Sequence, residues 1–109
     1  MAAAELGRRG YRIVASNYRC RSGEIDFVAQ ESGCLVFIEV RCKRSDSYGT
    51  AAESVTRSKQ AKIVAAAERY LDEMSVSDTD CRFDVVTVVP RSGRLEVDEI
   101  IRDAFQASR

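Results

Sequence analysis

Two acidic side chains inside apolar segments are the residues of this chain best suited to chemistry. Asp26 lies within residues 23–29, and Glu39 lies within residues 35–43, a stretch that ends in basic side chains. An ionised carboxylate in an apolar strand is costly unless a cation or a network of hydrogen bonds compensates its charge. Mg²⁺ binds in proteins to one or two carboxylates, together with water and phosphate oxygens. The pattern therefore predicts a site for a divalent metal and a phosphate, as in a nuclease.

The two acidic segments are expected to form neighbouring strands of a hairpin. Residues 23–30 and 34–43 are rich in β-branched and aromatic side chains, and residues 31–33 between them suit a tight turn. Because side chains alternate across a strand, Asp26 and Glu39 converge if the hairpin pairs their faces. Both carboxylates then lie on one face of the sheet.

The same alternation brings other charged side chains close to the acids. Arg41 and Lys43 share the strand face of Glu39. Glu24, on the preceding strand, is either a further site residue or an ion-pair partner of Arg21 or Arg41. In phosphodiester hydrolysis a bound metal supplies a nucleophilic hydroxide, and nearby cations stabilise the charged phosphate.

The remaining elements predict an α/β architecture. We expect a helix over 2–9 ending at Gly10, strands over 11–18, 83–89 and 95–97, a main helix capped by Thr56, and a terminal helix over 98–107. The apolar stripe of the main helix is Ile63, Val64, Ala67, Tyr70, Leu71 and Met74. Pro90 is expected to end the strand before it. The order of strand, helix and strand predicts a right-handed crossover with parallel strands. One domain over residues 1–109 is expected, with a mixed sheet of four or five strands flanked by helices.

Charge is balanced over the chain but not along it. Lys and Arg together number 17, as do Asp and Glu, so the protein is not a polycation. Residues 1–60 hold ten basic and seven acidic side chains, whereas residues 61–109 hold seven and ten. The basic excess thus lies in the half with the candidate site. It is compatible with a nucleic-acid partner and also with an ordinary mixed surface.

Neither a membrane span nor a zinc site is expected. No segment approaches the roughly 18 apolar residues of a membrane helix, and the N-terminus lacks an apolar signal region, so we expect a cytoplasmic protein. The chain has four cysteines without close pairs, and no histidine. Because structural zinc sites usually pair close ligands, the cysteines are expected to be reduced and structural.

Five short motifs in order along the chain resemble the YraN family. They are residues 21–26 (RSGEID), 37–41 (FIEVR), 53–59 with Glu53 and Lys59, 82–86 (RFDVV) and 100–105 (IIRDAF). This bacterial family is similar to archaeal Holliday-junction resolvases, which adopt the restriction-endonuclease-like fold. The resemblance implies a three-layer α/β domain and a DNA endonuclease dependent on Mg²⁺ or Mn²⁺. Branched DNA is one implied substrate, and a homodimer is implied because related resolvases act as dimers. The alternative is a non-catalytic nucleic-acid-binding module on an inactivated nuclease fold.

The resemblance also assigns roles to individual residues. The superfamily motif is an aspartate followed on the next strand by Glu-x-Lys. In this sequence Asp26 and Glu39 become the metal ligands, and the Val40 carbonyl is a further candidate ligand. Arg41 occupies the lysine position. Since a guanidinium binds phosphate but stays protonated, Lys43 is the candidate to take over that role.

Other residues are candidates for contact with nucleic acid. They are Arg21, Arg44, Lys59 and Gln60. The last two lie at the start of the main helix, where the helix N-terminus favours an anion. Glu53 is either part of a capping box with Thr50 or a further site residue.

Overall fold

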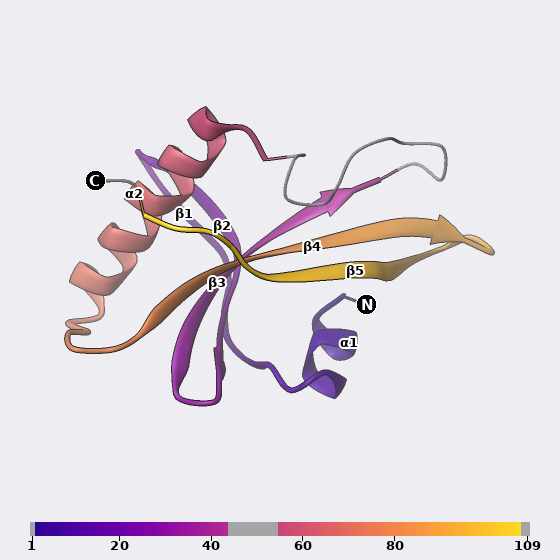
Figure 1. The fold of residues 1–109 in the computed structure, drawn as a ribbon, viewed down its shortest axis with the longest axis horizontal. Helices are drawn as coiled ribbons and strands as arrows, with labels where there is room; N and C mark the ends of the chain where they lie inside the picture. Colours follow the sequence, from indigo (N-terminus) through magenta and orange to yellow (C-terminus); the bar gives the residue numbers. More distant parts are fainter. Residues whose placement is uncertain (1, 44–54, 108–109) are drawn as a thin grey trace.

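The chain folds around one twisted sheet of five strands (Figure 1). The computed structural model describes residues 2–43 and 55–107. The strands are β1 (Arg12–Cys20), β2 (Gly23–Glu31), β3 (Cys34–Cys42), β4 (Cys81–Arg91) and β5 (Arg94–Phe105). Their order in the sheet follows the sequence. The β3 and β4 strands run parallel, whereas the other neighbouring pairs are antiparallel. The sheet is therefore mixed, as the sequence predicts.

Two helices lie on opposite faces of this sheet and make it the middle of three layers (Figure 1). The α2 helix (Arg57–Glu73) covers one face with Ile63, Ala66 and Tyr70. On the other face, α1 (Ala2–Arg8) contributes the fully buried Leu6. Burial on both faces explains why β3 and β4 are apolar at most positions. The predicted α/β class is confirmed, and the layering is consistent with a restriction-endonuclease-like fold.

The main helix begins where the sequence predicts. Thr56 is the N-cap of α2, and its Oγ1 accepts a hydrogen bond of 3.2 Å from the backbone N–H of Lys59. Ile63 and Tyr70 of the predicted stripe are buried, whereas Met74 follows the last turn and is 54% exposed. Neither helix in the described part of the chain has the length and apolar character needed to cross a membrane.

Two of the tight turns between antiparallel strands have positive φ at both of their residues. Ser32 and Gly33 between β2 and β3 have φ of 51° and 79°, and Ser92 and Gly93 between β4 and β5 have φ of 50° and 78°. Positive φ at both positions is typical of type I′ turns, whose twist matches that of paired strands. The first turn is the one that the sequence predicts. The second makes β4 and β5 a long hairpin that the sequence does not predict.

The C-terminal residues form a strand, so the prediction of a helix over 98–107 is wrong. The β5 strand also absorbs the short strand expected over 95–97. Its less exposed apolar side chains are Val97, Ile100, Ile101, Ala104 and Phe105, and this spacing is that of a helix. Register shifts against β4 insert extra residues into β5, and such bulges change the face that each later residue meets. The spacing therefore belongs to a bulged strand.

The β4 strand continues through Pro90, so the prediction that Pro90 ends this strand is wrong. The β3 strand ends at Cys42, opposite Val88, so the rest of β4 lies beyond the last β3 pair. Pro90 is paired with Leu95 of β5. A proline lacks the N–H of a central strand but is tolerated at a sheet edge, which is the situation of this segment.

A buried carboxylate joins the N-terminal segment to the last strand. Asp84 of β4 is fully buried and accepts hydrogen bonds from the Tyr11 hydroxyl at 2.6 Å and the Arg82 guanidinium at 2.8 and 2.9 Å. It also accepts one of 2.9 Å from the N–H of Asp103, whose φ of 54° lies within a bulge of β5. These contacts compensate the buried charge and fix the bulge.

Candidate functional site

The carboxylates of Asp26 and Glu39 lie where β2 and β3 separate. The register of these strands ends at Phe27 opposite Ile38, so the two acids are the next residues along. The first part of β2 lies beside α2, whereas the last part of β3 extends away from α2 (Figure 1). The Asp26 carboxylate lies close enough to Glu39 to raise the pKa of Glu39. The hairpin register thus brings the two acids together.

The backbone of β3 holds Asp26 in place. Its Oδ2 atom accepts a hydrogen bond of 2.7 Å from the N–H of Val40. The carboxylate therefore acts as an acceptor at the end of the β2–β3 ladder. In the structure the Val40 N–H contacts Asp26, and the metal-ligand role of the Val40 carbonyl stays a prediction.

Glu39 is a buried acid whose surroundings disfavour its charge. It is 4% exposed. Burial, and then the Asp26 carboxylate, raise the pKa of Glu39 above its ordinary value. Two cations act in the opposite direction, since Arg41 Nη1 and Lys59 Nζ each lie 3.5 Å from Glu39 Oε2. Two neighbouring carboxylates ionise together only when positive charge compensates them, so the pair suits a proton or a metal ion between them.

The start of α2 supplies one of these cations. Lys59 lies in the first turn of the helix, which the Thr56 cap fixes. The neighbouring Gln60 has a different partner, because its Nε2 donates a hydrogen bond of 3.0 Å to the Val55 carbonyl. Lys59 therefore contacts Glu39, while Gln60 bonds the helix to the segment before it.

Lys43, the expected substitute for the family lysine, is held elsewhere. Its Nζ lies 3.3 Å from Asp98 Oδ2 on β5. Asp98 in turn pairs with Arg91 at 3.3 Å, so it links the end of β3 to the β4–β5 hairpin. The ammonium group beside Glu39 is that of Lys59 and not that of Lys43.

The other residues that the sequence predicts for the site do not pair with Asp26 or Glu39 in the part of the chain that the structure describes. Glu24 pairs with Arg19 at 3.1 Å rather than with Arg21 or Arg41, because Arg19 is its direct partner across the β1–β2 hairpin. Arg21 is exposed in the turn of that hairpin. Arg44 and the capping-box residue Glu53 lie outside the described residues.

A buried hydroxyl that the sequence does not point out lies beside the site. Thr87 of β4 is the register partner of Arg41 and is 1% exposed. Its Oγ1 has no hydrogen-bond partner among the residues described. A threonine in a run of valines gives no signal by itself, so only the pairing of β3 with β4 reveals it.

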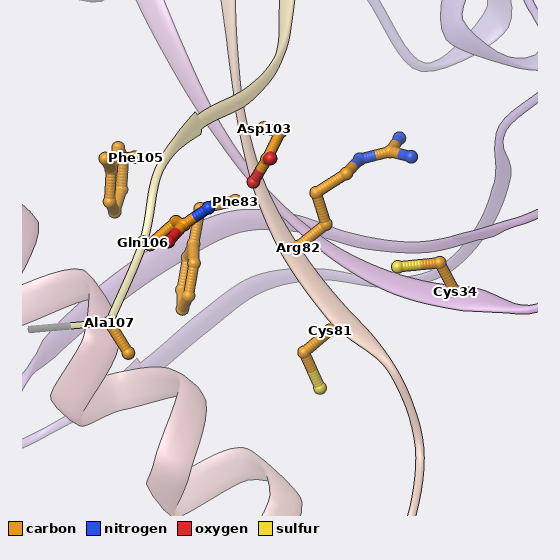
Figure 2. Close-up of a pocket in the computed structure, with 8 residues that line it drawn as sticks. All are labelled: Cys34, Cys81, Arg82, Phe83, Asp103, Phe105, Gln106 and Ala107. Carbon is orange, nitrogen blue, oxygen red and sulfur yellow. The ribbon is translucent and has the colours of Figure 1, made fainter.

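A further cavity lies at the other end of the sheet (Figure 2). It measures about 690 Å³ and is lined by Cys34 at the start of β3, Cys81 at the start of β4 and Phe105 at the end of β5. Burial raises the pKa of both thiols, which are free, so they stay protonated and behave as small apolar groups. Within residues 2–43 and 55–107, no three Asp, Glu, Cys or His side chains form a metal-binding cluster. The described part of the candidate site is thus the carboxylate pair with its cations.

Comparison with known proteins identifies the family. Residues 1–88, which include both carboxylates and Lys59, match the family described as "Uncharacterised protein family UPF0102". The chain belongs to the UPF0102 family. A UPF0102 protein of Symbiobacterium thermophilum is 49% identical over 108 residues, which cover 97% of this chain and 91% of that protein. A relative from Saccharophagus degradans is 45% identical over 97 residues, with coverages of 88% and 80%. A relative from Chlorobium phaeobacteroides is 42% identical over 113 residues, with coverages of 98% and 88%. The YraN resemblance is thereby confirmed for this UPF0102 member, and its activity has to be argued from the site.

Proposed function

We propose that this protein is a metal-dependent DNA endonuclease, with branched DNA as a candidate substrate. The observation that carries the proposal is that the β2–β3 register brings Asp26 and the buried Glu39 together at the end of the ladder, and burial and Asp26 both raise the pKa of Glu39. A pair of acids at the end of a strand ladder is energetically unfavourable without a compensating cation. Such a pair is suited to metal binding, since the metal relieves the repulsion that the fold imposes.

The donors present fit Mg²⁺ or Mn²⁺. Both are hard ions that favour oxygen ligands, and Mg²⁺ usually takes only one or two protein carboxylates while water and phosphate oxygens complete its shell. Asp26 and Glu39 would supply the protein oxygens. When bound, the metal would activate water and offset the charge that develops on the phosphate.

The chain's own cations have separate roles in this proposal. Lys59, 3.5 Å from Glu39, takes the part that the resemblance gives to a lysine on the strand, and it contacts the phosphate or the attacking water. Arg41, also 3.5 Å from Glu39, binds phosphate oxygens through its planar guanidinium. The hydrogen bond from Val40 keeps the Asp26 carboxylate in a fixed orientation. This assignment replaces Lys43 by Lys59.

The second candidate is a nucleic-acid-binding module without catalysis. The observation that favours it is that arginine stands at the lysine position and Lys43 is paired with Asp98. If Lys59 does not serve the reaction, the remaining cations only bind phosphate. This candidate predicts salt-sensitive DNA binding without cleavage by any divalent metal.

Calorimetric titration with Mn²⁺ and Mg²⁺, with and without a short DNA duplex, tests the proposal first. We expect wild type to bind metal, Glu39→Ala and Asp26→Ala to lose binding, and the control Glu24→Ala to keep it, because Glu24 pairs with Arg19 away from the acids. Cleavage of branched and linear DNA is then compared between wild type, Lys59→Ala and Lys43→Ala. The nuclease proposal expects loss of cleavage in Lys59→Ala and retention in Lys43→Ala. Metal binding that survives Glu39→Ala, or DNA binding without cleavage in any metal, contradicts it.

A further inference from the structure

A groove lined by arginines lies on the face of the sheet opposite α2. It is formed between α1 and the β4–β5 hairpin, which pass close to each other (Figure 1). Its volume is about 610 Å³. Arg8 and Arg9 line it from the end of α1, and Arg91 and Arg94 line it from the hairpin. We call it the arginine groove.

The charge of the arginine groove is positive after its internal ion pairs are counted. Glu5 is shared by two guanidinium groups, with Arg8 Nη2 at 2.9 Å and Arg9 Nε at 2.7 Å. Glu96, the other acid of the lining, lies 3.7 Å from Arg91. The lining thus holds four arginines and two carboxylates, and Arg91 also pairs with Asp98, an acid outside the lining that Lys43 shares. The guanidinium groups remain accessible, since the side chains of Arg8 and Arg91 are 69% and 58% exposed.

Ion pairs extend from the groove to Lys43, just beyond the end of β3. Arg91 Nη2 lies 3.3 Å from Asp98 Oδ1, and Lys43 Nζ lies 3.3 Å from Asp98 Oδ2. Lys43 comes two residues after Arg41, which contacts Glu39. Basic side chains therefore follow one another from the carboxylate pair, past the end of β3, to the groove.

The lining also contains apolar surface. Leu95 is 46% exposed at the groove, and Val97 lies beside it on β5. A single inorganic anion would leave this surface in water. A chain of phosphates carrying flat, partly apolar groups would contact both the guanidinium groups and Leu95.

We propose that the arginine groove binds the phosphodiester backbone of nucleic acid, as a contact surface separate from the carboxylate pair. The inference rests on the proposed function for the identity of the ligand, but it uses different residues and does not require catalysis. Guanidinium groups on two elements would hold successive phosphates, and the basic side chains around Asp98 would guide the strand toward Glu39.

Salt dependence of DNA binding in EDTA tests the inference, because chelation removes any contribution of the metal. The full chain is titrated into a fluorescein-labelled oligonucleotide, duplex or single-stranded, over a series of salt concentrations. Each lost phosphate contact lowers the slope of log affinity against log salt by roughly 1, so Arg91→Ala combined with Arg94→Ala should lower it by roughly 2. Arg8→Ala combined with Arg9→Ala tests the other wall.

Arg69→Ala is the matched control. Arg69 is an arginine of α2 that is 60% exposed and paired with Glu73, and it lies outside the groove lining. It should leave the slope unchanged. Thermal unfolding of every variant shows whether the fold is retained. The two double variants change different elements, so if one of them does not fold, the other still tests the inference.

Each possible result either supports or overturns the inference about the arginine groove. Slopes reduced by both double variants and unchanged by Arg69→Ala support the inference. Slopes equal to that of wild type overturn the inference. The nuclease proposal is then tested separately by the metal titration. Groove-dependent DNA binding without metal binding at Asp26 and Glu39 supports the groove while refuting the nuclease. Absence of oligonucleotide binding overturns it, and so does groove-dependent binding to phosphatidylglycerol vesicles alone.

Discussion

Replacing Glu39 by glutamine is expected to stabilise the metal-free protein at neutral pH. The substitution keeps the size of the side chain and removes the charge that burial and Asp26 disfavour. A substitution at a candidate catalytic residue is expected to stabilise the protein when the ligand-free fold contains an unfavourable interaction that the bound ligand relieves. The same variant should lose the response to Mg²⁺ or Mn²⁺.

The magnitude follows from the groups around the carboxylate. Two unit charges about 4 Å apart interact by about 4 kcal/mol at an effective dielectric constant near 20, which sets the scale of the repulsion between ionised Asp26 and Glu39. Arg41 and Lys59 oppose it from 3.5 Å, but their side chains are 37% and 43% exposed. Because solvent screens these partly exposed cations, we allow about 0–1 kcal/mol for each pair. Allowing about 1 kcal/mol for an imperfectly bonded amide, we expect a gain of about 1–3 kcal/mol.

The pH dependence gives the prediction its sign. The folded-state pKa of Glu39 lies above its ordinary value of 4.5. At pH values between the unfolded-state and folded-state pKa, the folded protein therefore binds more protons than the unfolded protein. The stability associated with protonated Glu39 is complete at low pH and is lost as the pH rises through the folded-state pKa. Glutamine does not titrate. The advantage of the variant should therefore be smallest in acid and grow toward neutral pH.

Thermal unfolding by circular dichroism in EDTA, from about pH 4.5 to about pH 8, measures this difference. A gain of that size corresponds to a rise in Tm of about 4–12 °C for a domain of this length. Glu24→Gln, an exposed acid in an ion pair, is the control and should change stability by less than about 0.5 kcal/mol. Adding metal at about 100 times its Kd should stabilise wild type by about 2.7 kcal/mol and leave Glu39→Gln unchanged. A variant that is less stable than wild type in EDTA at neutral pH refutes the reasoning.

Three further substitutions test contacts elsewhere in the fold, each by urea or thermal unfolding. Gly23→Ala would place a Cβ 3.0 Å from the Lys62 carbonyl oxygen at a φ of +158°. The β1–β2 hairpin should therefore move away from α2, at a cost of about 1–3 kcal/mol in the free energy of unfolding. An unchanged urea midpoint contradicts this. Thr87→Val removes a buried hydroxyl without a described partner and should be neutral or stabilising by up to about 1 kcal/mol, whereas clear destabilisation would reveal a role for that hydroxyl. Arg102, and with it Arg82, lowers the pKa of Glu31 to about 2, so Glu31 contributes stability above its unfolded-state pKa that is lost as the pH falls. Glu31→Gln should therefore cost about 2 kcal/mol at neutral pH and progressively less in acid, and a cost that does not shrink in acid argues against this ion pairing.

Much of the fold could be predicted because its signals are local. Alternation of apolar side chains and the Ser32–Gly33 turn specify the β2–β3 hairpin, and the Thr56 cap with buried Ile63 specifies α2. The meeting of Asp26 and Glu39 follows from the register of that hairpin. The C-terminal strand could not be predicted in the same way. Its apolar residues have the spacing of a helix, and only pairing with β4 produces the bulges that accommodate this spacing.

By itself, therefore, the sequence determined the family, the α/β class and the two acids at the centre of the candidate site. The tertiary structure decided which cations surround them. Lys43 and Lys59 have long flexible side chains. The sequence makes Lys43 the substitute for the family lysine on the strand face of Glu39, and it makes Lys59 a phosphate contact at the start of the main helix. The β5 strand brings Asp98 to Lys43, whereas the crossover helix brings Lys59 to Glu39. Ion pairs between distant segments depend on how elements pack, and no pattern within one segment contains that information.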